Sequence, residues 1–458
     1  MADSQPTSTP PSGAAAVSST TTPPKPRNPA LKMLGLPALP RKLPSRNWMI
    51  FWAITGAFTT AIVYDKREKK RATAKWRRAV EPLSRELISS PNALPRKLTV
   101  YLEAPPGDGL RVAQDHFIEY VKPVLAASGL DWEFVQGRQQ GDVRAAVAEK
   151  IRRSRMTHER PGEEIPQTDD SVVEDLRKRM GLADYEGIKG DIVIGRHAWK
   201  EYMRGLHEGW LGPLNAPPLP EPIPEPVAET KPEPEATSTT DDKAETKPEE
   251  EKKEEKKEVK PSRPPQPRPH NTTNDYESAT LPLQIPAEFS PSTVIPFPHR
   301  LGFTQTFVRL GRFLNRRHLA DDIGREVAAV CFAAAREWRE ADGQYEQERV
   351  LEEGERDWPK STWKEEEPQT EDEKKKAATE PPKERIWTSS MVIDPRVAQR
   401  MRRFEIQPED AERAAKIVVP EEEVEGWIKG SLRSMWRWGA SSFESKPKGP
   451  NIGNVDDE

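Results

Sequence analysis

An apolar segment without charge, residues 47–64, constrains the fold of this chain more than any other feature. As an α-helix its roughly 18 residues would rise about 27 Å, close to the hydrocarbon thickness of a bilayer. A buried core helix would show a polar face, and a signal peptide would be followed by a small-residue cleavage site. The segment has neither, so it predicts a single transmembrane helix. The residues expected to anchor it are Trp48, Ile50, Phe51, Trp52, Ile54, Phe58, Ile62 and Tyr64.

Basic residues follow this segment closely. Five of them are predicted to lie at lipid headgroups: Lys66, Arg67, Lys69, Lys70 and Arg71. Residues 65–87 have the composition of a juxtamembrane helix that can lie along anionic lipid. A solvated helical linker is an alternative of equal weight.

Composition limits how much of the chain can pack into a core. Of its 458 residues only 34% are hydrophobic and 47 are proline, which is too little apolar surface to order every residue. The formal net charge of −4 excludes a chain-wide nucleic-acid binder. Cys331 is the single cysteine, which excludes an intramolecular disulfide and a cysteine-based zinc site. Much of the chain is therefore expected to be linker.

Pattern and composition divide the chain into nine segments. They are a disordered basic leader (1–46), the transmembrane helix (47–64), a basic juxtamembrane helix and linker (65–96), an α/β domain (97–212), a disordered Pro/Glu/Lys linker (213–279), an extended strip and helix (280–354), a polar insertion (355–384), a C-terminal strand and helix (385–443) and a tail (444–458).

The α/β domain alternates predicted strands and helices. Strands are predicted at residues 97–104, 132–135 and 191–195, and helices at residues 110–128, 142–155 and 171–180. Pro123 predicts a kink or an early end of the first helix. The order of these elements predicts a small α/β layer of parallel strands with right-handed crossovers.

The region after the linker is expected to be mainly helical. Prolines in residues 281–298 argue against a regular central strand and predict an extended strip. Helices are predicted at 320–348 and 420–443, with a strand at 386–393 between them. The last helix would place Val424, Trp427, Ile428, Leu432, Met435 and Trp436 together, for core packing, an interface or a membrane surface.

The sequence carries no phosphate-loop, zinc-protease or serine-hydrolase motif. The loop PPGDG, residues 105–109, follows a strand and precedes a helix, where backbone N–H groups can hold a phosphate, but Gly-Asp-Gly is also a common turn. His197, His207 and Glu208 have helical spacing without further metal ligands and are predicted to be surface or capping residues. No catalytic residue, cofactor or metal is predicted.

Several segments together resemble one family. They are a Pro-rich leader, WMIFWAITGAF with the YDKREKKRATAKW that follows it, KLTVYLEAPPGDGL, DIVIGRHAWKEYMRGLHEGWLGPL and IPFPHRLGF. Over most of its length outside the charged linkers, the chain resembles the fungal fifty-four-kilodalton subunit of the mitochondrial inner-membrane carrier translocase. The resemblance implies a non-enzymatic scaffold in the mitochondrial inner membrane, with one span and its bulk in the intermembrane space.

The resemblance also implies partners. They are the pore subunit and the other subunits of the carrier translocase, and the small intermembrane-space chaperones that deliver multispanning carriers. Membrane lipid is expected from the span itself. The basic residues after the span favour the opposite topology, because the positive-inside rule alone places the C-terminal part in the matrix. We follow the family and expect the C-terminal part to lie in the intermembrane space.

A second function stays open. The α/β domain is distantly similar to the nucleotide-binding half of lipid kinases, although it lacks their Gly-Gly-Asp-Gly loop. The alternative to a scaffold is therefore a membrane-tethered, degenerate lipid or nucleotide kinase-like protein that retains ligand binding at PPGDG.

Overall fold

A computed structural model describes residues 45–86, 94–162, 169–182, 185, 187–217, 266–300, 302–356 and 384–443. The predicted tail, nearly all of the leader and most of the linker and the polar insertion lie outside these residues. Contacts between residues group the chain into two compact units, Met1–Thr60 and Ala61–Glu458. The boundary between them falls inside α2 (Arg46–Val80), a helix of 35 residues.

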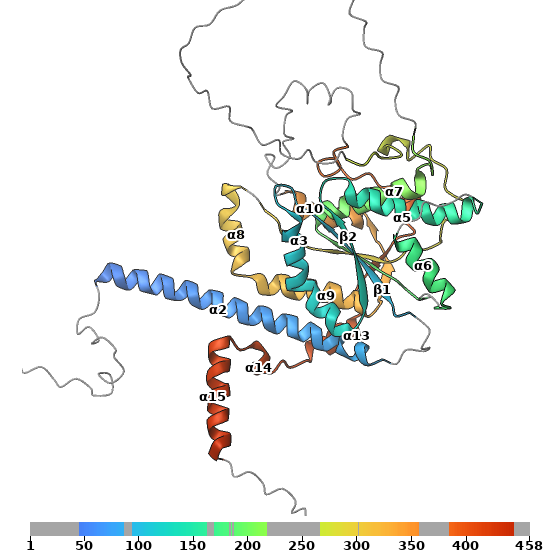
Figure 1. Ribbon diagram of the computed structural model, residues 1–458. Coiled ribbons are helices and arrows are strands. Elements are labelled where there is room, and N and C mark those ends of the chain that lie inside the picture. Colours follow the sequence, from blue (N-terminus) through green and yellow to red (C-terminus); the bar gives the residue numbers. More distant parts are fainter. Residues whose placement is uncertain are drawn as a thin grey trace, which may run out of the picture. The chain divides into compact units, whose positions relative to one another are not determined.

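A six-stranded sheet forms the centre of the second unit, in the order β2-β1-β3-β4-β8-β5 (Figure 1). Its strands are β1 (Lys97–Glu103), β2 (Asp131–Gly137), β3 (Asp191–Ile194), β4 (Ser292–Ile295), β5 (Ala335–Glu337) and β8 (Arg402–Phe404). Every neighbouring pair is parallel except β5 and β8. Val100 fixes the register of β1, opposite Phe134 of β2 and Ile192 of β3. The predicted α/β class with parallel strands is confirmed, and strands from beyond the linker extend the same sheet.

Helices cover both faces of this sheet. Successive side chains of a strand point to opposite faces, so apolar residues of β1 contribute to a core on each side. Leu98, Val100 and Leu102 of β1 face a core shared with α3 (Leu110–His116), α4 (Lys122–Ser128) and α9 (Arg316–Cys331). Tyr101 faces the other core, with α5 (Asp142–Glu159) and α7 (Arg196–Leu211). The layers are therefore helix, sheet and helix.

Pro123 neither ends nor breaks its helical segment. A π-helical turn, Phe117–Val121, joins α3 to α4, and Pro123 stands in the first turn of α4. The helical backbone thus runs through the proline, and the change in hydrogen-bond pattern at the π-helical turn lies just before it.

Two predictions for the region after the linker are wrong. β4 is a central strand, since Pro291 and Pro296 lie just outside its four residues and remove no N–H from the ladder. Residues 386–393 form turns and irregular backbone, not a strand. Their polar groups serve α7 instead, because Trp387 Nε1 donates to Glu201 at 2.9 Å and the carbonyl of Ser389 accepts from Lys200 at 2.8 Å.

The long helices predicted near the C-terminus are shorter than expected. α9 ends at Cys331, Ala333 takes a positive φ of 55°, and β5 follows. A hairpin of β6 (Glu340–Ala341) and β7 (Gln344–Tyr345) then leads to α10 (Glu346–Arg356). The last helix is divided into α14 (Glu421–Val424) and α15 (Trp427–Phe443). The other described elements are α6 (Asp169–Arg179), α8 (Thr306–Phe313), α12 (Pro395–Ala398), α13 (Pro408–Ala415) and the 3-10 turns Glu81–Arg85, Thr273–Asp275 and Phe303–Gln305.

The predicted transmembrane segment 47–64 lies within α2. Across the described parts of the chain, no helix combines the length and the mean hydropathy needed to cross a membrane. The structure therefore leaves the predicted span unconfirmed.

Candidate functional site

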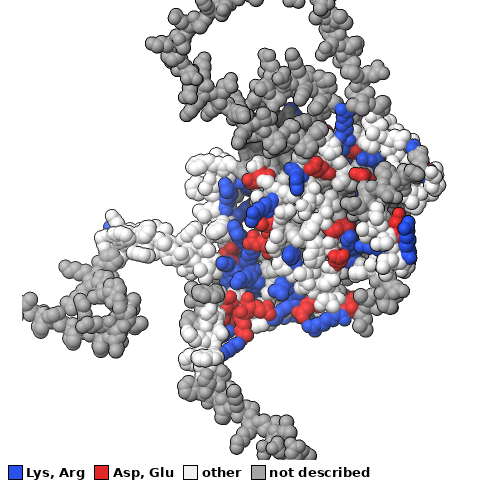
Figure 2. Space-filling view, in the orientation of Figure 1, with Lys and Arg blue, Asp and Glu red and all other residues white. Residues whose placement is uncertain are grey.

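The N-terminal half of α2 exposes large apolar side chains in the described structure. Of the predicted anchor residues, Trp48, Ile50, Phe51, Trp52, Ile54, Phe58 and Tyr64 are exposed and Ile62 is half-buried. Figure 2 shows this half of the helix almost without acidic or basic side chains. Contiguous exposed apolar surface of this kind marks a contact with another apolar phase or partner.

Two hydroxyls of this segment are bonded to the backbone of the helix itself. Thr59 Oγ1 donates to the carbonyl of Thr55 at 2.7 Å, and Thr60 Oγ1 donates to that of Gly56 at 2.7 Å. These two hydroxyl donors are therefore paired, as a helix in an apolar environment requires.

Three of the five predicted headgroup residues have carboxylate partners in the protein. Arg67 Nη2 lies 2.9 Å from Glu421 Oε1, Arg71 Nη1 lies 2.8 Å from Glu68 Oε1, and Lys69 pairs with Glu119. The other two, Lys66 and Lys70, are exposed and have no ion-pair partner among the described residues. A headgroup contact stays a prediction for all five residues. Lys66 and Lys70 are the two best placed for it, because they are exposed and have no carboxylate partner among the described residues.

Asp65, the first residue after the apolar segment, caps another helix. Its carboxylate accepts from the backbone N–H groups of Arg316 and Arg317 at 3.2 Å each, at the start of α9. These N–H groups have no partner inside their own helix, and the helix dipole favours a negative charge there. The guanidinium of Arg317 also lies 5.3 Å from the ring centre of Tyr64. The end of the apolar segment is thus fixed to α9.

The second half of α2 is packed into the α/β core. Trp76 is 2% exposed, and its Nε1 donates to Asp321 Oδ1 at 2.7 Å. Gly324 of α9 allows this approach, since a Cβ at that position would lie 2.2 Å from Trp76 Cδ1. The absence of a side chain at Gly324 therefore sets how closely α2 meets α9.

The PPGDG loop follows β1 and contacts the segment that follows β4. The N–H of Asp108 donates to the carbonyl of Pro105 at 3.1 Å, and Gly107 takes a positive φ of 85°. The Asp108 carboxylate lies 2.6 Å from Nε2 of His299, which follows β4. This partner lies 191 residues away in the sequence, so sequence reasoning missed it.

The prediction that His197, His207 and Glu208 are surface or capping residues is wrong. All three are buried, because α7 is covered by α5 and by segments from beyond the linker. His207 Nδ1 lies 2.7 Å from the carbonyl of Met203, and its Nε2 accepts from the N–H of Asp394 at 2.9 Å. Within the described residues, no group of three or more His, Cys, Asp or Glu side chains could hold a metal.

Buried histidines make stability dependent on pH. Burial lowers the pKa of His116, His197 and His207 to about 4 each, below the value of about 6.5 expected in the unfolded chain. The unfolded chain therefore binds protons first, so stability present above about pH 6.5 is lost as the pH falls toward 4.

We expect His207→Gln to reduce this loss of stability at low pH, measured as unfolding temperature against pH for the full chain in mild detergent. His318→Gln, at an exposed position, should keep the wild-type slope, and an unchanged slope for His207→Gln would contradict the prediction.

Sequence reasoning also missed a buried acidic pair. Glu103 at the end of β1 and Glu201 on α7 are both fully buried. Apart from an interaction with the side chain of Trp387, the Glu103 oxygens have no hydrogen-bond donor among the described residues, whereas a protonated Glu103 can donate to Glu201. Burial first, and then the charge of Glu201, raises the pKa of Glu103 well above its usual value. Glu201 also accepts from the N–H of Gly141 at 2.6 Å and that of Val143 at 3.1 Å, so the pair joins β1, α5 and α7.

Comparison with known proteins gives consistent results. Residues 28–404 match the family model described as inner membrane protein import complex subunit Tim54. A Neurospora crassa protein named mitochondrial import inner membrane translocase subunit tim54 is 60% identical to this chain, covering 93% of the chain and 90% of that protein. An Aspergillus oryzae protein of the same name is 42% identical, covering 92% of the chain and 99% of that protein. A Saccharomyces cerevisiae protein named translocase subunit TIM54 is 33% identical over 41% of the chain and 51% of that protein.

Proposed function

Since the chain belongs to the Tim54 family of inner membrane protein import complex subunits, we propose that it is a non-enzymatic scaffold of the mitochondrial inner membrane translocase that inserts multispanning carrier proteins. The observation that carries the proposal is α2, in which an exposed apolar half is continuous with a half packed into the α/β core. A helix of this kind couples a membrane anchor to a rigid domain. That domain would then hold the pore subunit, the other subunits and the small chaperones in place.

The anchor in this proposal is the segment 47–64. Several residues that lower its mean hydropathy are ones that a bilayer accepts. They are tryptophans near one end, a tyrosine at the other, and Thr59 and Thr60, whose hydroxyls bond the helix backbone. Lys66 and Lys70 lie just beyond it and are exposed, as expected of residues that meet anionic headgroups.

A charge in this segment should release the chain from the membrane. We expect Ile54→Arg to make insertion less favourable by about 2.5 to 3.5 kcal/mol, because the guanidinium would lie near the bilayer centre. The measurement is the fraction of the full chain that resists carbonate extraction from mitochondrial membranes. Ile54→Leu is the matched control and should extract as the wild type does. Full retention of Ile54→Arg in the membrane pellet would exclude a span at this position.

The proposal places the α/β unit in the intermembrane space, where it would receive cargo. When the outer membrane is ruptured and the inner membrane stays sealed, added protease should remove the region from about residue 85 onward. Protection of this region would reverse the topology and favour the positive-inside rule applied to the basic residues after the segment.

The scaffold role itself is tested by isolating the intact complex in mild detergent through a tag on the full chain. We expect the pore subunit, other translocase subunits and small chaperones to be recovered with it, and Asp108→Ala to recover the same set, since Asp108 contacts His299 and shapes a turn. Recovery of the chain alone would contradict a scaffold. ATP-dependent lipid phosphorylation that is lost in Asp108→Ala would instead favour the kinase-like alternative.

A further inference from the structure

An amphipathic helix, α8, exposes its apolar side. Phe303, in the turn that precedes α8, is 92% exposed, Phe307 is 85% exposed and Leu310 is 43% exposed. Their spacing of four and three residues places them on one side of the helix. Two exposed phenylalanines, one in the turn and one on the helix, form an apolar surface that a water-facing segment would not carry.

The same segment is strongly basic. Between Gly302 and Ala320 the chain has four arginines and no aspartate or glutamate. Arg309 and Arg312 are exposed and lie on the side of α8 opposite Phe307. An apolar side combined with a basic side is the pattern of a helix that lies in the surface of an anionic bilayer.

The C-terminal end of α8 is linked through α9 to the end of the apolar segment of α2. α8 ends at Phe313, whose ring centre lies 4.8 Å from the guanidinium of Arg316. The N–H of Arg316 is in turn bonded to Asp65, the first residue after the apolar segment. If α2 crosses the membrane, the end of α8 is therefore held near the point where α2 leaves it.

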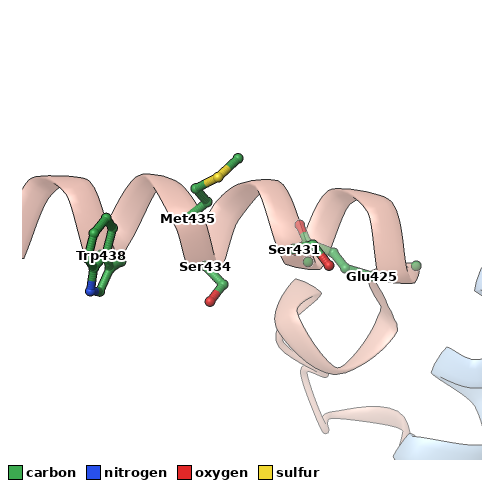
Figure 3. Close-up of a pocket in the computed structure, with 7 residues that line it drawn as sticks. Glu425, Ser431, Ser434, Met435 and Trp438 are labelled. Carbon is green, nitrogen blue, oxygen red and sulfur yellow. The ribbon is translucent and has the colours of Figure 1, made fainter.

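A second helix, α15, is attached to the same stretch of α2. Arg67 of α2 pairs with Glu421 at 2.9 Å, and Arg78 pairs with Glu423 at 2.6 Å, which holds α14 against the helix. α15 follows α14 directly, and Met435, Trp436 and Trp438 on it are 64%, 79% and 74% exposed. Figure 3 shows Met435 projecting away from α15. Tryptophan favours the headgroup region of bilayers.

We propose that α8, together with α15, lies on the surface of the anionic bilayer in which α2 is anchored, with Phe303 and Phe307 inserted below the headgroups. This inference rests on the proposed anchoring of α2. The bilayer is the occupant of the apolar side because α8 is linked through Arg316 to Asp65 at the end of the anchor and because the arginines of α8 match anionic headgroups in charge. The two helices would fix the orientation of the α/β unit relative to the membrane, which a single span alone leaves free to tilt.

The test uses the full chain reconstituted into vesicles of phosphatidylcholine and phosphatidylglycerol, with one fluorescent label on an introduced cysteine. The native Cys331 is buried and should not react. Labels are placed in separate variants at Phe307→Cys on α8, at Ile54→Cys in the anchor and at Glu149→Cys on α5, an exposed position on the other face of the sheet. Lipids carrying a quencher at shallow or deep positions report the depth of each label.

We expect the label at residue 307 to be quenched most by shallow quenchers, the label at 54 by deep quenchers, and the label at 149 by neither. Quenching at 307 should weaken several-fold in vesicles of phosphatidylcholine alone and in an Arg309→Gln, Arg312→Gln variant. Quenching at 54 without quenching at 307 would overturn the inference and leave the anchor intact. Quenching at 307 without deep quenching at 54 would support the surface contact of α8 and reject the span. A label at 307 that is shielded from aqueous iodide but not quenched by lipid would show a protein partner or a second copy there, which also overturns the inference.

Discussion

Replacing Glu208 with alanine is expected to lower the free energy of unfolding by about 3 to 5 kcal/mol. The side chains of Glu208 and Arg144 are fully buried, and that of Arg152 is 11% exposed. The carboxylate accepts from both guanidinium groups and from the N–H of His270. Burial alone would raise the pKa of Glu208, but the charge of Arg144 and these hydrogen bonds hold it below its usual value. Glu208 is therefore ionised in the folded protein. Its loss leaves Arg152 without its carboxylate and Arg144 with only Glu384, at 4.0 Å.

Urea unfolding of the full chain in mild detergent, followed by circular dichroism, measures this change. Glu149→Ala is the matched control, since Glu149 pairs with Arg153 at 2.7 Å on the surface of α5, where its side chain is 60% exposed. An exposed ion pair of this kind contributes about 1 kcal/mol or less. A loss for Glu208→Ala no larger than that for Glu149→Ala would show that the buried arginines find other partners. A Glu208→Leu, Arg144→Met double variant should recover part of the loss, because it removes the buried charge of Arg144.

The elements that could be predicted from the sequence are those with a strong local pattern. β1 alternates apolar and polar residues and ends at a glycine turn, and α5 repeats apolar residues at helical spacing, so both were predicted to within a few residues. β4 and β8 contain four and three residues, too few for any period to appear. Their place in the sheet depends on parallel pairing with strands roughly a hundred residues away, which no local pattern encodes. The prolines beside β4 also argued against a central strand, which led to the wrong prediction.

The candidate site divides in the same way. The apolar segment of α2 is local and could be found directly, along with the basic residues after it. The contacts that position it are not local, since Asp65 caps a helix 251 residues away and Arg67 meets Glu421 at a separation of 354 residues. The burial of the histidines of α7 could not be predicted either, because it also depends on contacts that are distant in the sequence. An amphipathic pattern predicts one buried face, but segments from beyond the linker cover the polar face of α7 as well.

The attachment of α2 to the α/β core should depend mainly on one side chain. Trp76 is almost fully buried between α2 and α9, and its Nε1 is bonded to Asp321. Replacing it with alanine removes one of the largest buried side chains of the described structure and leaves a cavity that the facing Gly324 cannot fill. We expect Trp76→Ala to lower the free energy of unfolding by about 3 to 5 kcal/mol.

Trp48→Ala provides the control within the same helix, because Trp48 is 56% exposed and lies outside the α/β unit. It should leave the free energy of unfolding nearly unchanged in detergent, while Trp76→Ala should also make the second half of α2 accessible to trypsin at Lys75, Arg77 and Arg78. Gly324→Ala should produce the same cleavage with the tryptophan intact, since its Cβ would lie 2.2 Å from the ring. If Trp76→Ala and Gly324→Ala both stay as resistant as the wild type, α2 is held by its ion pairs with Glu119, Glu421 and Glu423 and not by the packing of Trp76. A membrane anchor would then be joined to its domain through surface charges, and the attachment would weaken with added salt.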